Sequence, residues 1–156
     1  MTQTYTSAPP AMPELPDPRY HADLYSGVTI KRLVAWCVDL LITALITAIL
    51  VPITLFTALF YLPFLYLMVS FFYRWISIAR GSATPGMRMA AIELRNRDGH
   101  RLETSEAALH TLGYTVSVGV FPLQLVSIAL MIISSRGQGL TDHIMGTAML
   151  NKRATY

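Results

Sequence analysis

The sequence predicts an all-α membrane protein, and two observations support this prediction: the composition and the long stretches without charge. Of the 156 residues, 53% are hydrophobic and 13% are charged, and the mean hydropathy is +0.46. An ordinary soluble domain has about 25% charged residues, so this composition argues against a water-soluble globular enzyme and a disordered chain. Residues 40–73 and 107–135 contain no Lys, Arg, Asp or Glu. We therefore expect the lipid bilayer to be a partner of the chain.

The first 23 residues differ in composition from the rest of the chain. They contain five of the nine prolines and show no apolar periodicity. Such a segment buries too little apolar surface to offset the entropy of ordering it. We therefore divide the chain into a disordered, proline-rich cytoplasmic tail at residues 1–23 and a transmembrane domain at residues 24–156.

The uncharged stretch at residues 40–73 predicts a transmembrane helical hairpin. As one straight helix its 34 residues would be about 50 Å long, whereas the hydrocarbon core of a bilayer is about 30 Å thick. Two membrane spans fit this length better than one. We place them at about residues 30–51 and 57–78.

A polar, arginine-rich loop follows the hairpin at residues 79–104. Within it, Ile92, Leu94 and Leu102 alternate with polar residues around Asp98-Gly99, a dipeptide that is typical of two-residue hairpin turns. We expect a small cytoplasmic β-hairpin here. A short basic helix at the membrane interface is the alternative.

The last apolar segment covers about residues 105–134 and predicts a third long or kinked helical segment with Pro122 near its middle. It either crosses the bilayer once, kinked at the proline, or returns there as two short arms. The twelve Lys and Arg residues lie near the start, in the middle and at the end of the chain, with none in the connection at about residues 51–56. Because cationic segments prefer the cytoplasmic side, an even number of crossings would keep all of them inside. This favours the returning arms and a cytoplasmic N-terminus.

Asp39 is the acidic residue that falls within a predicted membrane span. An isolated carboxylate at that depth costs several kcal/mol, so it needs a cation, water or a proton beside it. Arg32 lies two helical turns earlier on about the same helix face, but the axial gap of about 10 Å is too long for a direct bond unless the arginine folds inward. Each of the two side chains either pairs with the other or finds a partner elsewhere in the chain.

Asp142 is the second acidic residue that needs an explanation, because it follows the last apolar segment directly. It is placed to cap a short helix, which would be a purely structural role. Alternatively, its carboxylate pairs with Arg32 at the cytoplasmic face of the membrane and attaches the end of the chain to the first span.

Three short motifs stand in order around the apolar segments. They are Tyr25-Ser-Gly27 with Arg32, Ala35 and Asp39; Gly81 through Arg88 followed by Asp98-Gly99; and Thr141-Asp142-His143 with Gly146-Thr147. Together these motifs resemble the RDD family of small bacterial integral membrane proteins, which is named after one arginine and two aspartates. The resemblance implies that this triplet is Arg32, Asp39 and Asp142, and that the chain lies in the bacterial inner membrane.

The resemblance covers about residues 25–152, and this sequence departs from the family pattern at two positions. Met87 stands where the family usually has a lysine, and His110 stands where an arginine commonly opens the last apolar segment. His110, His143 and Arg88 lie in or beside the matching motifs and are secondary candidates for functional residues.

Two classes of function are open, one implied by the resemblance and one by the energetics of buried charges. One is transport of cations, protons or small solutes, in which membrane-embedded Asp39 acts with Arg32 and Asp142. An ionisable group held in lipid can exchange a proton for a cation, and a nearby arginine lowers its pKa enough for the proton to leave. The alternative is a structural or accessory membrane subunit, in which the same three residues form a buried ionic lock between segments.

Other kinds of chemistry have little support in the sequence. The four histidines stand singly, without metal-ligand spacing, and no nucleophile with its base or pair of catalytic carboxylates is evident. We therefore expect no enzyme activity, no metal and no cofactor. The mild excess of positive charge is explained by membrane orientation and not by nucleic acid. A chain this short is expected to form a homo-oligomer or to bind another membrane protein.

Overall fold

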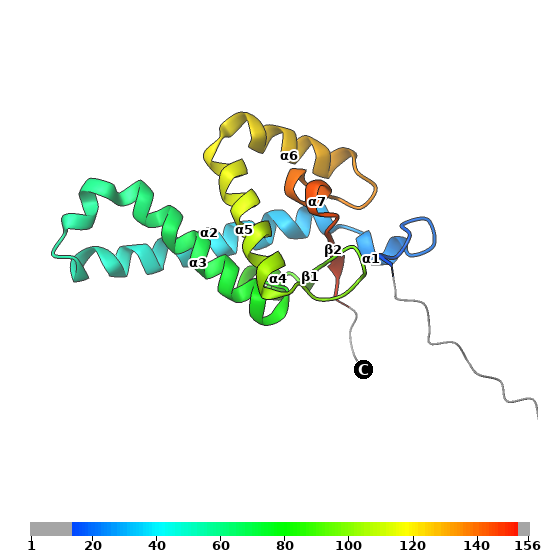
Figure 1. The fold of residues 1–156 in the computed structure, drawn as a ribbon, viewed down its shortest axis with the longest axis horizontal. Helices are drawn as coiled ribbons and strands as arrows, with labels where there is room; N and C mark the ends of the chain where they lie inside the picture. The colour runs from blue at the N-terminus through cyan, green and yellow to red at the C-terminus, as the bar shows by residue number, and fades with distance from the viewer. Residues whose placement is uncertain (1–13, 153–156) are drawn as a thin grey trace, which may run out of the picture.

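The computed structural model describes residues 14–152 and is mostly helical, with one small sheet (Figure 1). The prediction of an all-α membrane fold with a helical hairpin, a third apolar segment and a small β element is confirmed. In chain order the elements are α1 (Ala22–Tyr25), α2 (Val28–Ile53), the 3-10 helix η1 (Thr57–Tyr61), α3 (Leu62–Gly81), α4 (Pro85–Met89), β1 (Ile92–Arg95), α5 (Thr104–Gly119), α6 (Phe121–Ile133), α7 (Leu140–Met145) and β2 (Ala148–Asn151).

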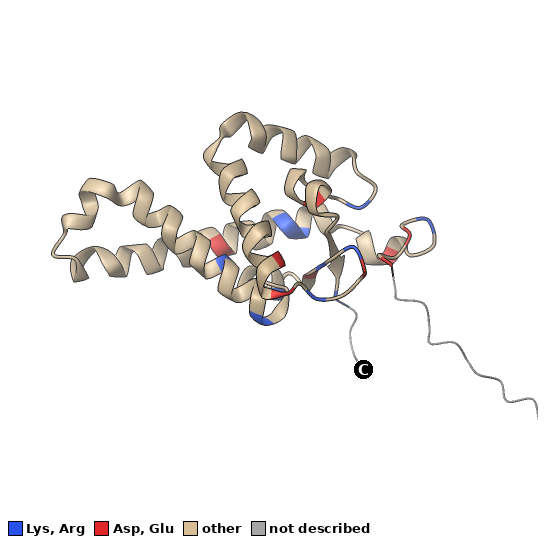
Figure 2. Cartoon of the chain, viewed as in Figure 1, with Lys and Arg blue, Asp and Glu red and all other residues tan. Residues whose placement is uncertain are grey.

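Helices α2 and α3 form the predicted membrane hairpin. By helical rise α2 is about 39 Å long and α3 about 30 Å, and both are apolar enough to cross a bilayer. The chain reverses between them at Leu55 and Phe56, which both have positive φ angles. Most large side chains on the outer faces of the hairpin are apolar and exposed, as expected for surfaces that contact lipid. Figure 2 shows that the outer half of the hairpin has no charged residue.

Helices α5 and α6 form a bent pair, with an angle of 114° between them. The bend lies at Val120, and Pro122 falls in the first turn of α6, two residues after the bend. Proline is tolerated there because the first turn of a helix leaves its N–H groups unpaired. The predicted segment at 105–134 is therefore two helices of 16 and 13 residues, and the reversal begins slightly before the proline.

The sheet joins parts of the chain that the sequence did not predict to pair. Strand β1 runs antiparallel to β2 at the end of the chain, with Ile92 opposite Asn151 and Arg95 opposite Ala148. The expected hairpin around Asp98-Gly99 is reduced to one isolated bridge between Arg95 and Arg101. The turn at Gly99 forms, but α5 begins at Thr104 and leaves too few residues for a second strand.

The expected tail at residues 1–23 falls into two parts. Residues 1–13 lie outside the described residues. Residues 14–23 are not a free tail, because Leu15 is buried against α1 and β2 and its N–H donates to the carbonyl of Arg97 at 3.2 Å. The hydroxyl of Tyr25 donates to the carbonyl of Pro16 at 2.7 Å. These apolar and hydrogen-bonding contacts with distant residues supply the ordering that local composition does not. These contacts form a small core that is separate from the main one and consists of Leu15, Leu24, Tyr25, Ala148 and Leu150.

Helix α1 and strands β1 and β2 lie together at one end of the molecule, away from the tip of the hairpin (Figure 1). Strands β1 and β2 lie in one sheet, so the bent pair α5–α6 leaves from and returns to the same end. Asn151 of β2 also donates hydrogen bonds to the carbonyls of Asp23 and Ser26, just before α2 begins. The main core lies beside this sheet, where α2, α3 and α4 pack together. It includes Val28, Ala35, Ile78, Met87, Ile92, Leu94 and Met149.

Candidate functional site

Asp39 on α2 is completely buried, and its carboxylate is surrounded by donors from α3 and α4. Its Oδ1 accepts hydrogen bonds from the hydroxyl of Tyr73 at 2.7 Å and from the backbone N–H of Gly86 at 2.9 Å. Its Oδ2 accepts one from the hydroxyl of Thr84 at 2.6 Å and lies 3.7 Å from Nη2 of Arg74. The carboxylate is therefore compensated by one cation and three hydrogen bonds.

The hairpin geometry brings Asp39 to its partners on α3. Asp39 and Tyr73 are each 17 residues from Phe56 in the turn, so antiparallel helices place them side by side. Thr84 and Gly86 come from the short helix α4, where Thr84 is the N-cap residue and also accepts the N–H of Met87. The hydroxyl of a threonine at this position accepts a hydrogen bond from a helix N–H and donates one to Asp39.

Gly86 is required by close packing between α2 and α4. A Cβ atom at this position would lie 2.3 Å from the carbonyl oxygen of Ala35 and 2.7 Å from Oδ1 of Asp39. Both distances are far below van der Waals contact. The absence of a side chain lets the backbone of α4 reach the carboxylate of Asp39.

Arg74 links this carboxylate to α5. Its guanidinium carbon lies 4.2 Å from the centre of the Tyr114 ring, a cation–π contact, and the side chain is largely buried. The hydroxyl of Tyr114 in turn accepts a hydrogen bond from the indole of Trp36 on α2 at 2.9 Å. The three side chains connect α2, α3 and α5.

Asp142 on α7 is the second buried carboxylate, with 1% of its surface exposed. Its Oδ2 accepts from Nη1 of Arg32 at 2.6 Å and from the N–H of Gly139 at 3.0 Å. Its Oδ1 lies 2.8 Å from Nε2 of His110 and accepts from the hydroxyl of Thr147 at 3.0 Å. Each oxygen is again shared by two donors, and the N–H of Gly139 is the capping contact at the start of α7.

The charge on Asp142 is stabilised in this environment. Burial alone would raise the pKa of its carboxyl, but the Arg32 guanidinium, the hydrogen bond with His110 and the N–H of Gly139 outweigh burial. The pKa therefore lies well below its ordinary value. Asp142 is held as an anion, which is the state that pairs with Arg32.

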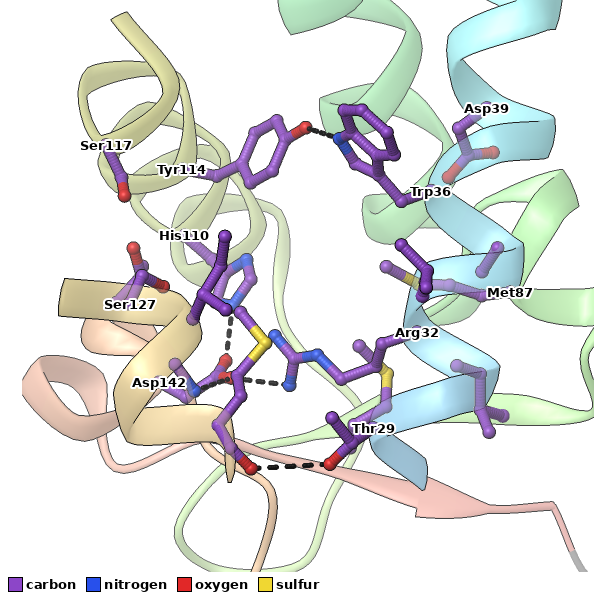
Figure 3. A pocket seen from close by; sticks show the side chains of 18 of the residues that line it. Thr29, Arg32, Trp36, Asp39, Met87, His110, Tyr114, Ser117, Ser127 and Asp142 are labelled. Atoms are coloured by element: carbon purple, nitrogen blue, oxygen red, sulfur yellow. Dashed lines mark hydrogen bonds and ion pairs between the residues drawn. The ribbon is translucent and has the colours of Figure 1, made fainter. Parts of the chain in front are cut away.

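A cavity of about 380 Å³ lies between α2 and the α5–α6 pair, and both carboxylate clusters border it. Figure 3 shows Arg32 reaching from α2 to Asp142, with His110 beside the same carboxylate and the Trp36–Tyr114 bond farther along the cavity. Helix α2 also contacts α6 directly, through the hydrogen bond from the hydroxyl of Thr29 to the carbonyl of Met131 at 3.3 Å.

The structure divides the predicted triplet between two separate ion pairs. Arg32 pairs with Asp142, as one of the sequence alternatives proposed, and Asp39 pairs with Arg74. Within residues 14–152 no ion pair joins Arg32 directly to Asp39. The axial separation of two helical turns explains this, because each side chain finds a closer partner on another element.

Of the three secondary candidates, His110, His143 and Arg88, only His110 contacts one of the two buried carboxylates in the described part of the chain. His110 is buried and contacts Asp142, so it belongs to the site. His143 is exposed and its Nδ1 lies 2.9 Å from the carbonyl of Gly139 in its own helix. Arg88 is exposed beside Gly81 and does not line the cavity.

The sequence reasoning missed Tyr73, Arg74, Thr84 and Gly86 as partners of Asp39. The signal for the first two was the hairpin register, since positions equidistant from the turn face each other. No local pattern marked Thr84 and Gly86, because α4 reaches Asp39 only through tertiary packing. In the described part of the chain, no group of three or more His, Cys, Asp or Glu side chains could hold a metal ion.

Two apolar helices of membrane-spanning length, a bent apolar pair and buried carboxylates matched by buried cations define a helical membrane protein. The chain belongs to the RDD family, whose model matches residues 27–146 and therefore includes Arg32, Asp39 and Asp142. The family resemblance of the sequence motifs is thus confirmed. No curated protein and no solved structure matched the chain.

Proposed function

We propose that this protein is a structural or accessory membrane subunit in which Arg32, Asp39 and Asp142 act as packing locks. The supporting observation is that each carboxylate oxygen of Asp39 and Asp142 already contacts two donors from the protein itself. One lock attaches α4 to the hairpin through Asp39. The other attaches α7, and with it the end of the chain, to the start of α2.

The energetics of buried ion pairs support this role. Removing one partner of a buried pair leaves an uncompensated charge and costs about 3–5 kcal/mol, even where the pair itself contributes little net stability. The locks therefore act mainly by excluding other arrangements of α4 and α7. Helix α4 is followed by β1 and helix α7 by β2, so the locks also position the two strands of the sheet.

Transport of cations, protons or small solutes through Asp39, Arg32 and Asp142 is the competing function. A cation that bound Asp39 would have to displace the donors from Tyr73 and Thr84, both within 2.7 Å of its oxygens. An exchange site needs a carboxylate that can release its partners at low cost. The cavity beside the two carboxylates is the feature that favours transport, and the packing of the carboxylates favours the locks.

We place the protein in the bacterial inner membrane with a cytoplasmic N-terminus, in a homo-oligomer or bound to another membrane protein, and without catalytic activity. The distribution of Lys and Arg along the chain supports the orientation, because none lies in the connection at about residues 51–56 and cationic segments prefer the cytoplasmic side. The shared sheet of β1 and β2 supports an even number of crossings, since α5–α6 begins and ends at one end of the molecule. Helices of 16 and 13 residues are about 24 and 20 Å long, which fits re-entrant arms better than full spans.

Flux and stability measured on the same variant distinguish the two functions. Wild type, Asp39→Asn and the exposed-site control Asp98→Asn are reconstituted in vesicles that contain a pH-sensitive dye, and a sodium gradient is applied. The lock predicts a lower thermal midpoint for Asp39→Asn alone, and no sodium-dependent proton flux above protein-free vesicles for any of the three. Flux in wild type that is lost in Asp39→Asn at an unchanged midpoint would establish transport instead.

A further inference from the structure

The cavity beside the locks has largely apolar walls and opens between α2 and α6. Its volume of about 380 Å³ lies within the range of about 300–1,000 Å³ that is usual for ligand sites. Ile30 and Leu33 on α2, and Ile128 and Ile132 on α6, line the cavity and are also exposed on the outer surface. These four side chains therefore mark an opening between α2 and α6. In a membrane, apolar side chains at such an opening contact the acyl chains of lipids.

Three polar atoms beside this apolar space have no hydrogen-bond partner. Over the residues that the structure covers, they are Nε of Arg74, Nδ1 of His110 and Oγ1 of Thr111. All three side chains line the cavity and are more than nine-tenths buried. A buried polar atom without a partner is destabilising, so an occupant that bonds to these atoms would be favoured.

The unpartnered atoms define the chemistry of the matching head group. Nε of Arg74 is a donor. Nε2 of His110 faces the carboxylate of Asp142, so Nδ1 is the ring nitrogen without a partner. The hydroxyl of Thr111 can donate or accept. A guanidinium donor, a ring nitrogen and a hydroxyl fit a group that can both donate and accept hydrogen bonds, such as an alcohol or a glycerol monoester.

The charge balance of the cavity selects an uncharged occupant. Arg32 is paired with Asp142 and Arg74 with Asp39, so the two cations are already compensated by two anions. An anionic head group would add a buried charge without its own cation, which is costly in an apolar environment.

We propose that this cavity binds an uncharged single-chain amphiphile from the bilayer, with its apolar chain along α2 and α6 and its hydroxyl or ester head at Thr111, His110 and Arg74. The occupant is of the monoacylglycerol or fatty-alcohol class. This binding site goes beyond the packing role proposed above, which fixes two walls of the cavity but needs no ligand.

Trp36 lines the cavity and reports on its contents, whereas Trp75 does not line it. The test uses the full chain with Trp75→Phe in detergent micelles, titrated with a monoacylglycerol whose acyl chain is brominated, because bromine quenches tryptophan fluorescence on contact. Unlabelled monodecanoylglycerol and decanoate are then added as neutral and anionic competitors.

Two variants and one matched control connect the quenching to this site. Thr111→Val keeps the shape of the side chain and removes a hydroxyl that has no partner within the protein. Ser117→Leu fills the cavity from α5. Thr115→Val removes the same group one turn from Thr111, where the hydroxyl donates to the carbonyl of Thr111 and does not line the cavity.

We expect saturable quenching that neutral monodecanoylglycerol relieves and decanoate does not. Thr111→Val should weaken the apparent affinity about fivefold at an unchanged thermal midpoint, as for one lost hydrogen bond. Ser117→Leu should abolish saturable quenching, and Thr115→Val should leave the affinity unchanged. The proposal is overturned if quenching is not saturable, if Thr111→Val and Ser117→Leu both bind as wild type does, or if decanoate competes better than the neutral compound.

Discussion

Arg32 and Asp142 lie 110 residues apart in the sequence, and their side chains meet at 2.6 Å. Arg32 belongs to the first membrane helix, α2, and Asp142 to the last helix of the described chain, α7, so this contact joins α2 to α7. His110, which lies on α5, contacts the other oxygen of the same carboxylate at 2.8 Å. Helix α7 is thereby fixed against the first span by a pair in which Asp142 is fully buried and the Arg32 side chain is 14% exposed.

Replacing Gly86 should disrupt the lock around Asp39. Gly86→Ala would place a Cβ 2.3 Å from the carbonyl of Ala35, so we expect a loss of about 2 kcal/mol or more in the free energy of unfolding. The measurement is reversible unfolding in mixed micelles. Gly119→Ala is the matched control, because a Cβ added at Gly119 would meet open space, and it should be neutral or slightly stabilising. Equal effects of the two changes would contradict this account of α4 packing.

Removing the hydroxyl of Tyr73 tests the hydrogen bond to Asp39 directly. Tyr73→Phe keeps the ring and deletes a donor to a buried carboxylate, which should cost about 1.5–3 kcal/mol. Tyr61→Phe, at an exposed ring in η1, serves as the control and should change stability by less than about 0.5 kcal/mol. Thermal unfolding in detergent compares the two. A Tyr73→Phe protein as stable as wild type would show that Asp39 does not depend on this donor.

Acid should weaken the lock at Asp142. The pKa of this carboxyl is lower in the folded protein than in the unfolded chain, where it is about 3.9. Its contribution to stability is therefore complete above about pH 4 and is lost as the pH falls further towards the folded pKa. We expect the thermal midpoint of wild type to decrease more steeply below pH 4 than that of Asp142→Asn, which starts lower. Parallel curves for the two proteins would contradict the assignment.

The two ends of the domain should lie on the same side of the membrane. Asn151 at the end of β2 donates hydrogen bonds to the carbonyls of Asp23 and Ser26, just before the first span, so we expect an even number of crossings. Reporters that are active on one side of the bilayer, fused in turn to each end of the chain, measure this. We expect both to be active in the cytoplasm. Opposite locations for the two reporters would show that α5–α6 crosses once.

Features set by local composition and periodicity could be predicted from the sequence. The hairpin, the apolar bent segment and the need for partners at Asp39 and Asp142 follow from uncharged stretches and from the cost of charge in lipid. The sequence also offered Arg32 as the partner of Asp142, since both border apolar segments.

Features set by distant contacts could not be predicted. Strand β1 pairs with β2 because the chain returns through α5 and α6, and the local turn at Asp98-Gly99 gave no sign of this. Residues 14–23 become ordered because Leu15 finds an apolar site on β2. Arg74 was not predicted as a partner of Asp39, although its position in the hairpin register places it beside this carboxylate.

The most direct test of the packing lock is a double-mutant cycle on Arg32 and Asp142. The free energy of unfolding is measured in mixed micelles for wild type, Arg32→Ala, Asp142→Ala and the double variant, with Arg95 and Glu93 as a more exposed control pair. Each single change should cost about 3–5 kcal/mol, and the coupling energy should be about 2 kcal/mol or more, against less than about 1 kcal/mol for the control. Additive costs for Arg32 and Asp142 would contradict the account.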